Sequence, residues 1–416
     1  MWINQFPNAV YANRARIVLS NWQSTAFLGQ HSKTTMALDI AIVRQSYRDD
    51  GGAERFVSRM IDALSQSDLT TTLVARSWNQ TERLPDQTRF VAANPPFLGR
   101  LTRAAGFSIA ARRRVSERQF DLVQTNERIP GFDVYRAGDG THAEWLRLKA
   151  QTQTAAARFG TLINPFHIYT KFIEKRVIEH PSLKAIICNS EMVRDQIQRD
   201  FEIEPSKCHV IYNSVDTDHF HPKLSKYRER VRSEFGIPLF ALLLVQVGSG
   251  FERKGVATSI KAVATNQNTH LLVVGKCSRT QRYQKMASDL SCGDRVHFAG
   301  VQADVRPFYG AADASILPTI YDPFPNVILE AMSCGLPIIS STTCGCVDII
   351  ESGMNGFVCD YRDTRAFADA IDKVSQTELR KQMGDNARSL MMEFTANRMQ
   401  QSLRDLYQSI LSLNSN

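Results

Sequence analysis

The sequence lacks features that would place it in several common protein classes. No uninterrupted apolar run approaches the roughly 20 residues that a membrane-spanning helix needs, which argues against an integral membrane protein. No cysteine precedes Cys188 or follows Cys359, and the eight cysteines in this range are not spaced as a disulfide framework. We therefore expect reduced thiols in a cytoplasmic protein.

The first 35 residues contain neither Asp nor Glu and show no hydrophobic periodicity. Their apolar stretches are too short for the core of a secretory signal. Met36 stands directly before the first strand-like run, residues 38–44. We expect residues 1–35 to be a poorly ordered extension that function does not require, and the first domain to begin at residue 36.

What the chain does contain is typical of a globular protein with two domains. It has 416 residues, 43% of them hydrophobic and 22% charged, which is enough for two full cores. The formal charge of +8 favours an anionic partner, whether nucleic acid, anionic lipid or a phosphorylated substrate. Strand-like and helix-like segments alternate through both halves without a short repeat, so we predict two α/β domains of similar build.

Residues 313–340, DASILPTIYDPFPNVILEAMSCGLPIIS, form the most informative stretch. Residues 314–317 have the apolar character of a buried parallel strand. Pro318, Pro323 and Pro325 then allow only a turn, and Pro325 suits the first position of a helix. The apolar period of residues 326–333 predicts that helix, and Gly335 ends it before a strand at 336–340. The turn therefore lies at the carboxyl end of a parallel strand, where α/β proteins bind ligands.

Two acids flank this turn, Asp322 before the predicted helix and Glu330 within it. Because eight residues correspond to about two helical turns, the two carboxylates are not close neighbours. They suit separate hydroxyl groups of one extended ligand better than a shared proton. The free N–H groups at the start of the helix, near Asn326, favour an anionic part of the same ligand.

The order Asp322, seven residues, Glu330-Ala-Met and then Cys-Gly-Leu-Pro resembles the Glu-x7-Glu signature of retaining glycosyltransferases of family 4. The resemblance implies an α/β, GT-B fold: two Rossmann-like domains with parallel sheets facing a central cleft. It implies that the first acid contacts the donor sugar and the second the nucleotide ribose. The first position here is Asp322 instead of Glu, which leaves the sugar open.

The same resemblance, which extends over nearly the whole chain from Met36, implies four segments. They are an extension (1–35), an acceptor-binding domain (36–220), a nucleotide-sugar-binding domain (221–395) and a terminal helix (396–416) that packs back on the first domain.

Basic and glycine-rich turns supply the remaining donor-site candidates. Gly248 opens a glycine turn after the strand 239–247, and this turn presents Arg253 and Lys254. Guanidinium and ammonium groups hold a diphosphate by charge-assisted hydrogen bonds. An ordinary turn with two solvated charges is the alternative interpretation. Gly51 and Gly52, after the first strand, resemble the loop that faces the diphosphate in the family, although they also suit a simple turn. The turn residues Phe324, Pro325 and Asn326 complete the predicted donor site.

The loop after the strand at 133–135 carries the acceptor-side candidates, Asp139 and His142. His142 would hydrogen-bond a sugar hydroxyl or a phosphate, and Asp139 would orient the acceptor; structural roles are the alternative for both. Residues 130–144 and the basic, aromatic stretch that follows resemble bacterial lipopolysaccharide-core glucosyltransferases. The stretch would suit a membrane surface or a phosphorylated glycolipid.

Two further charged segments have competing interpretations. Residues 100–118 contain six arginines and one acid, Glu117, which fits either a solvated helix face or a patch for an anionic membrane surface. Asp216 and Asp218, with His219 and His221 nearby, resemble a DxD metal motif. We reject a metal here because Asn213-Ser-Val-Asp resembles the interdomain crossing of the family, and because spacing alone supplies no convergent ligand set.

The predicted reaction is metal-independent transfer of a hexose, with glucose from UDP-glucose as the first guess, to a glycolipid or lipopolysaccharide-core acceptor with retention. Asp322, Glu330, Arg253, Lys254, His142 and Asp139 would form the catalytic set. The protein would be cytoplasmic or peripheral on the inner face of the membrane, with no cofactor and no nucleic acid bound. A GT-B sugar-nucleotide epimerase and a non-catalytic sugar-nucleotide-binding protein remain the alternatives. A nucleic-acid binder fits the charge but not the acidic and basic site residues.

Overall fold

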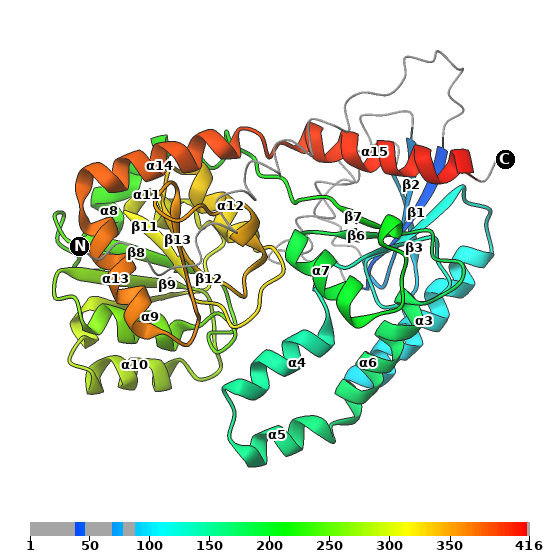
Figure 1. Ribbon diagram of the computed structural model, residues 1–416, viewed down its shortest axis with the longest axis horizontal. Helices are drawn as coiled ribbons and strands as arrows, with labels where there is room; N and C mark the ends of the chain where they lie inside the picture. Colours follow the sequence, from blue (N-terminus) through cyan, green and yellow to red (C-terminus); the bar gives the residue numbers. More distant parts are fainter. Residues whose placement is uncertain (1–37, 46–68, 78–87, 414–416) are drawn as a thin grey trace, which may run out of the picture. The chain divides into compact units, whose positions relative to one another are not determined.

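The computed structural model describes residues 38–45, 69–77 and 88–413 (Figure 1). The predicted extension 1–35, the glycines Gly51 and Gly52 and the helix expected after them lie outside the described residues. The described part of the chain divides into two compact units. One comprises residues 215–395, and the other comprises residues 38–214 with the terminal segment from Ala396. The division falls at Ser214–Val215, six residues before the predicted boundary.

The unit that contains residues 38–214 is built on a seven-stranded, all-parallel sheet in the order β3-β2-β1-β4-β5-β6-β7. The edge strand β3 was not predicted; its Thr and Arg residues break the apolar pattern of a strand. The strands are β1 (Leu38–Val43), β2 (Leu69–Ala75), β3 (Thr88–Ala92), β4 (Leu122–Thr125), β5 (Val134–Arg136), β6 (Ala185–Cys188) and β7 (Cys208–Val210).

Alternating side chains of the central strand β1 divide between two cores. Ile40 and Ile42 pack with the terminal helix α15 (Ala396–Leu413), whereas Ala41 and Val43 pack beneath α3 (Gly99–Ser116). The terminal helix therefore belongs to the core of this unit. The other helices of the unit are α4 (His142–Gln151), α5 (Ala155–Leu162), α6 (Pro165–Ile178), α7 (Glu191–Asp200) and the 3₁₀ turn η1 (Pro205–Lys207).

The unit of residues 215–395 has a six-stranded, all-parallel sheet in the order β10-β9-β8-β11-β12-β13. Its strands are β8 (Leu242–Val247), β9 (Thr269–Val274), β10 (Val296–Gly300), β11 (Ala314–Leu317), β12 (Ile338–Ser341) and β13 (Gly356–Cys359). Each sheet has the parallel, helix-covered architecture expected of a Rossmann-like domain, as predicted.

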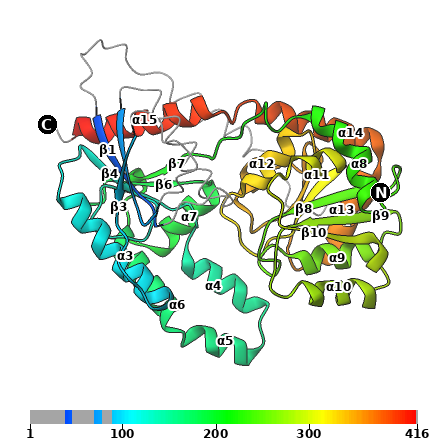
Figure 2. The same ribbon diagram turned by 180° about the vertical axis from the view of Figure 1, so that it is seen from behind.

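Helices cover both faces of this second sheet (Figures 1 and 2). α9, α10 and α13 bury one face of it in a single hydrophobic cluster, and α12 contacts β11 and β12. The helices are α8 (Arg228–Glu234), α9 (Val256–Ala264), α10 (Thr280–Asp289), α11 (Arg306–Ala311), α12 (Asn326–Ser333), α13 (Thr364–Ser375) and α14 (Thr377–Met391). The 3₁₀ turns are η2 (Pro222–Tyr227), η3 (Gly293–Arg295) and η4 (Gly345–Asp348).

Three local predictions for this unit need correction. The strand expected from residue 239 begins at Leu242, because Leu239 and Phe240 are exposed, Phe240 at 92%. The helix expected at 347–351 is the short 3₁₀ turn η4. Pro325 is the N-cap of α12, so the first helical residue is Asn326; the helix 326–333 itself was predicted correctly.

None of the helices that the structure describes combines the length and apolarity needed to cross a membrane.

Arg232 on α8 is fully buried and connects three segments of the second unit. Its guanidinium pairs with Asp313 at 2.6 Å and donates to the carbonyl oxygens of Pro238, Ala241 and Ala311. Asp313 also pairs with Arg228 at 2.9 Å, so loss of Arg232 would leave this largely buried carboxylate with one cation instead of two and the buried carbonyls without this donor.

We predict that Arg232→Met destabilises the protein by about 3–5 kcal/mol, because Asp313 and several buried carbonyls lose their main donor. Arg230→Met on the same helix is the matched control, since Arg230 is exposed. Urea unfolding followed by circular dichroism measures both. Equal midpoints for the two variants would contradict a stabilising role for Arg232.

Candidate functional site

The loop between β11 and α12 places Asp322 in contact with both predicted basic residues. Its Oδ2 lies 2.8 Å from Arg253 Nη1 and 2.6 Å from Lys254 Nζ. The loop itself is fixed on its other side, because Asp322 N–H donates to the Thr343 carbonyl and Gly345 N–H donates to the Asp322 carbonyl. The acid and the two cations, which are 68 and 69 residues apart in sequence, thus form one cluster at the carboxyl end of the sheet.

Glycines allow the turn after β8 to reach this position. Gly255 has a φ of +72°, and a Cβ there would lie 1.8 Å from the Pro318 carbonyl oxygen. Gly248 has a φ of +139°, and a Cβ there would lie 3.0 Å from Lys254 Cε. Both positions therefore require glycine. The Arg253 carbonyl accepts hydrogen bonds from Ile320 N–H and Thr319 Oγ1, which hold the turn against the β11 loop.

The charges of this cluster persist at neutral pH. Burial raises the pKa of Asp322, but Lys254 and Arg253 outweigh it, and the pKa of this carboxyl lies below its ordinary value of 3.8. Because the folded-state pKa is depressed, the stabilisation exists above the unfolded pKa and is lost as pH falls through the folded value. Asp322 is therefore ionised throughout the neutral range, and the cluster carries one net positive charge.

Helix α12 begins beside this cluster and carries Glu330 about one turn further on. Glu330 is buried, and its Oε2 lies 3.0 Å from the Tyr309 hydroxyl on α11. Phe324 and Asn326, predicted for the donor site, are buried in the same loop and helix start. As expected, Asp322 and Glu330 engage different partners and share no proton. The N-terminal end of α12 adds a partial positive charge near Asp322.

In the other unit, His142 is the first residue of α4 and is held by α6. Its backbone N–H lies 2.9 Å from one carboxylate oxygen of Glu174 and 3.0 Å from the other. Its Nε2 lies 3.1 Å from Nδ1 of His167, and its ring packs edge-on against Phe166. Burial, followed by the charges of Arg128, Lys171 and Lys149, lowers the pKa of His142 to about 3. The imidazole is therefore neutral at pH 7 and acts as a hydrogen-bonding group, not as a cation.

The structure identifies functional candidates here that the sequence analysis missed. Arg128 pairs with Glu174 at 2.8 Å and donates to the Gly140 carbonyl, so it connects the β4 end to the loop of His142. Arg136 is buried and donates to Asn213. Arg128 follows β4 by three residues, a position that could have identified it, whereas Glu174 lies on a helix without a local motif. Asp139 is exposed in the same loop.

The residues of the rejected metal motif have structural roles. Asp216 Oδ1 accepts the backbone N–H groups of Asp218 and His219, and His221 Nδ1 accepts that of Lys223. Within the described ranges, no three His, Cys, Asp or Glu side chains are grouped as metal ligands.

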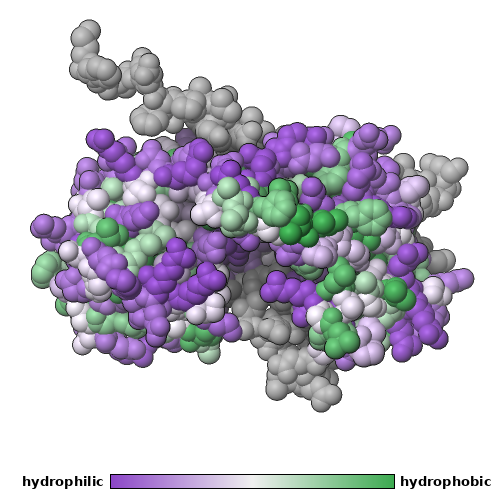
Figure 3. Space-filling view, turned by 90° about the horizontal axis from the view of Figure 1, so that it is seen from below, coloured by the Kyte–Doolittle hydropathy of each residue, from purple (hydrophilic) through white to green (hydrophobic). Residues whose placement is uncertain are grey.

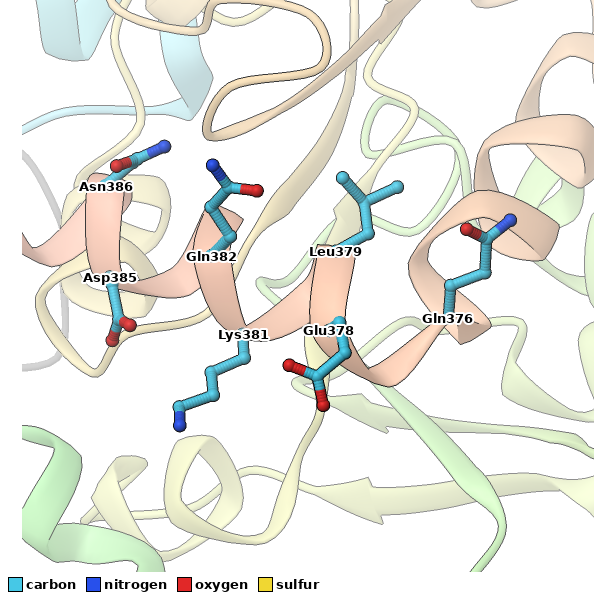
Figure 4. Close-up of a pocket in the computed structure, with 7 residues that line it drawn as sticks. All are labelled: Gln376, Glu378, Leu379, Lys381, Gln382, Asp385 and Asn386. Atoms are coloured by element: carbon cyan, nitrogen blue, oxygen red, sulfur yellow. The ribbon is translucent and has the colours of Figure 1, made fainter.

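A hollow of about 740 Å³ lies along α14, far in sequence from either cluster. Its lining side chains come almost entirely from that single helix and spread along it instead of converging on one point (Figure 4). It is open to solvent and offers no arrangement of catalytic groups. The lining residues are Gln376, Glu378, Leu379, Lys381, Gln382, Asp385 and Asn386.

Comparison with known proteins addresses the family of the chain. The family model described as glycosyl transferases group 1 matches residues 228–390, and the model described as Glycosyltransferase Family 4 matches residues 50–219. The lipopolysaccharide glucosyltransferase WaaG of Escherichia coli is 28% identical over 69% of this chain and 76% of WaaG. The lipopolysaccharide core biosynthesis glycosyltransferase LpsE of Rhizobium meliloti is 32% identical over 44% of this chain and 53% of LpsE.

More distant relatives include a D-inositol 3-phosphate glycosyltransferase of Corynebacterium kroppenstedtii, 25% identical over 58% of this chain and 56% of that protein. The chain thus spans only about half the length of several relatives that it matches. Among solved structures, WaaG superposes with a TM-score of 0.75 at 24% identity, over 88% of this chain and 99% of that one.

Anabaena HepE in complex with UDP and glucose gives a TM-score of 0.67 at 19% identity, over 89% of this chain and the whole of that one. At such identities the structural likeness speaks for the fold alone, and the fold is GT-B. The two family models match most of the sequence between them, and with the WaaG and LpsE likeness they show that the chain belongs to the group 1 (family 4) glycosyltransferases.

Proposed function

We propose that this glycosyltransferase moves a hexose, glucose in the first instance, from a nucleotide diphosphate sugar to a hydroxyl group of a lipopolysaccharide-core or related glycolipid acceptor, with retention. The observation that carries the proposal is the Asp322 cluster beside the start of α12. It joins two cations, a helix N-terminus and one carboxylate, which match a diphosphate and an adjoining sugar. The acceptor class is supported by two relatives: WaaG is a lipopolysaccharide glucosyltransferase, and LpsE is a glycosyltransferase of lipopolysaccharide core biosynthesis.

Each donor-site residue has a distinct role in this proposal. Arg253 and Lys254 neutralise the charge that develops on the leaving diphosphate, where electrostatic stabilisation has its largest effect on rate. Asp322 accepts hydrogen bonds from sugar hydroxyls, and Glu330 accepts them from the ribose. The backbone N–H groups at the start of α12 contribute to binding the phosphates. These groups need no metal to balance the diphosphate charge.

Retention follows from attack on the face of the sugar that the diphosphate leaves. The bond between the sugar C1 and the diphosphate oxygen breaks, the acceptor oxygen bonds to C1, and the acceptor proton passes to the leaving phosphate. His142 serves as a neutral partner for the acceptor in this scheme, with Asp139 exposed nearby. No covalent glycosyl-enzyme is required.

A membrane-facing role is the final part of the proposal. Helix α5 has no buried side chain, and apolar residues gather there beside hydrophilic ones (Figure 3). Phe159 and Leu162 on α5 and Phe172 on α6 are exposed, as are the basic Arg158 and Arg176. Such a surface suits peripheral binding at the interface of an anionic membrane. On α3, the expected patch is weaker, because Arg113 and Arg114 pair with Glu117.

The first experiment is a thermal-shift and hydrolysis screen of the purified protein against UDP-, GDP- and ADP-sugars, with and without EDTA. We expect one sugar nucleotide, UDP-glucose first, to stabilise the protein and to be hydrolysed slowly, and EDTA to change neither. Stabilisation that EDTA removes would contradict metal independence. Stabilisation without hydrolysis or transfer would favour a binding protein, and a changed sugar configuration would favour an epimerase.

We predict that Glu330→Gln lowers kcat/KM about 10- to 100-fold, because a neutral amide replaces the charged acceptor for the ribose hydroxyls. Glutamine keeps the volume of this buried side chain, so the fold should persist. Tyr309→Phe is the control, since it removes the hydroxyl beside Glu330 Oε2 and keeps the carboxylate. Steady-state kinetics measure kcat/KM of both variants, and their melting temperatures check that both are folded. A Glu330→Gln enzyme with unchanged kcat/KM would refute the assignment.

Asp322→Asn should separate nucleotide binding from sugar transfer. Removing this carboxylate leaves both cations free for the diphosphate, so we expect UDP to bind about tenfold more tightly, equivalent to about 1.4 kcal/mol. Transfer should fall about 100-fold, because an interaction with the sugar hydroxyls is lost. Asp322→Glu, which keeps the charge, is the matched control and should retain wild-type UDP affinity. Calorimetry and kinetics measure both; weaker UDP binding by Asp322→Asn would contradict this arrangement.

A further inference from the structure

The two imidazoles of His142 and His167 lie in a positively charged part of the N-terminal unit. Helix α6 packs against both α3 and α4. After burial, the pKa of His142 is lowered by Arg128, by the neighbouring His167 and by Lys171 and Lys149. After burial, the pKa of His167 is lowered by Lys149 and Arg100. Lys171 lies one turn after His167 on α6, and Lys149 lies two turns after His142 on α4, so each lysine shares a helix face with its histidine. Arg100 lies on α3, which packs against α6.

Three of these cations have no carboxylate partner within the described part of the chain. Lys149 lies over the ring of Trp145, at 5.7 Å, and Lys171 and Arg100 are exposed. Neighbouring acids are already engaged by other cations. Glu144 pairs with Arg147 and Arg199, Glu174 with Arg128, Glu179 with Lys175, and Glu117 with Arg113 and Arg114.

The distribution of charge is therefore selective. Glu174, which accepts the His142 N–H, neutralises Arg128, whereas Arg100, Lys149 and Lys171 have no carboxylate partner among the described residues. Three like charges around two half-buried neutral rings repel one another, and a bound anion would relieve that repulsion. In the His142–His167 hydrogen bond one ring donates and the other accepts, so the two neutral rings together keep one N–H that can donate to such an anion without adding charge.

We propose that Arg100, Lys149 and Lys171, together with His142 and His167, form a phosphate-binding site for the acceptor. We call these five residues the histidine–lysine site. The ligand is a phosphate group, carried either by the sugar portion of the acceptor or by a lipid headgroup beside it. This proposal rests on the transfer reaction proposed above, and it adds that the acceptor is an anion recognised through its phosphate.

The position of the site agrees with this role. His142 begins α4 directly after the loop that contains Asp139, and this loop follows the carboxyl end of β5. Glu174 accepts the His142 N–H, and Arg128, its ion-pair partner, holds the loop before His142. With its backbone fixed in this way, His142 can contact a phosphate while the loop holds the adjoining sugar. A phosphate bound here would place the acceptor by a charged anchor instead of by hydroxyl contacts alone.

The test is a titration of the full-length protein, labelled selectively in its histidine rings, with inorganic phosphate. Saturating UDP occupies the donor site, and His142→Gln and His167→Gln assign the two signals. We expect phosphate to shift both signals with saturation. The triple variant Arg100→Gln, Lys149→Gln, Lys171→Gln should bind at least about tenfold more weakly. Lys175→Gln, which removes a paired lysine of α6, is the control and should bind as the wild type does.

Vesicles distinguish the two sources of the phosphate. If phosphatidylcholine vesicles that contain phosphatidylglycerol displace inorganic phosphate, and pure phosphatidylcholine vesicles do not, the headgroup is the source. If neither displaces it, the phosphate belongs to the sugar portion of the acceptor. Unchanged histidine signals on adding phosphate, or equal binding by the triple variant and the wild type, would overturn the proposal. Slow hydrolysis of UDP-glucose, measured separately, reports on the donor reaction, so failure of one proposal leaves the other open.

Discussion

Every strand pair in both sheets is parallel, and this single constraint determines where the chemistry of the protein lies. In a parallel sheet all carboxyl ends share one edge, so each loop that leaves a strand arrives at the same place. The turn after β8 and the loop after β11 therefore meet, although Lys254 and Asp322 are 68 residues apart. The ends of β4 and β5 likewise bring Arg128 and the loop before His142 together. Loops of different length can vary on this edge while the sheet stays unchanged.

The two clusters differ in how they balance charge. Asp322 is held between Arg253 and Lys254, which leaves one net positive charge next to a helix N-terminus. Such a site is preorganised for an anion yet is not an uncompensated cationic pocket, since a buried lysine without a partner would be costly. Around His142 the balance differs: Arg128 is paired with Glu174, whereas Arg100, Lys149 and Lys171 have no carboxylate partner among the described residues. At the Asp322 cluster, a substrate phosphate can replace the carboxylate as the partner of the two cations. Around His142, an anion can bind the cations directly, because no carboxylate has to be displaced.

Sequence reasoning predicted most of the second unit because its signals are local. Four prolines and Gly335 punctuate residues 313–340, and helix 326–333 was predicted correctly except that Pro325 is its N-cap instead of its first residue. Arg253, Lys254 and Asp322 follow strand ends, so the parallel topology alone brings them together. Edge strand β3 was missed because Thr88 and Arg89 break its apolar pattern, and the start of β8 was misplaced because Leu239 and Phe240 are apolar but exposed. The contacts of Glu174 and His167 depend on how α6 packs, which no local pattern encodes.

The terminal helix has a consequence for the order in which the protein folds during synthesis. Met399, Leu403, Leu406, Tyr407 and Ile410 fill the core beneath β1, and the Tyr407 hydroxyl donates to Gln124 of β4 at 2.7 Å. The unit of residues 38–214 therefore lacks one wall of its core until α15 has been made. Among the described residues, the hydrophobic cluster of the other unit draws only on residues 215–395. Domains usually fold in order of synthesis; here the sheet that is made first keeps one apolar face uncovered until residues 396–413 follow.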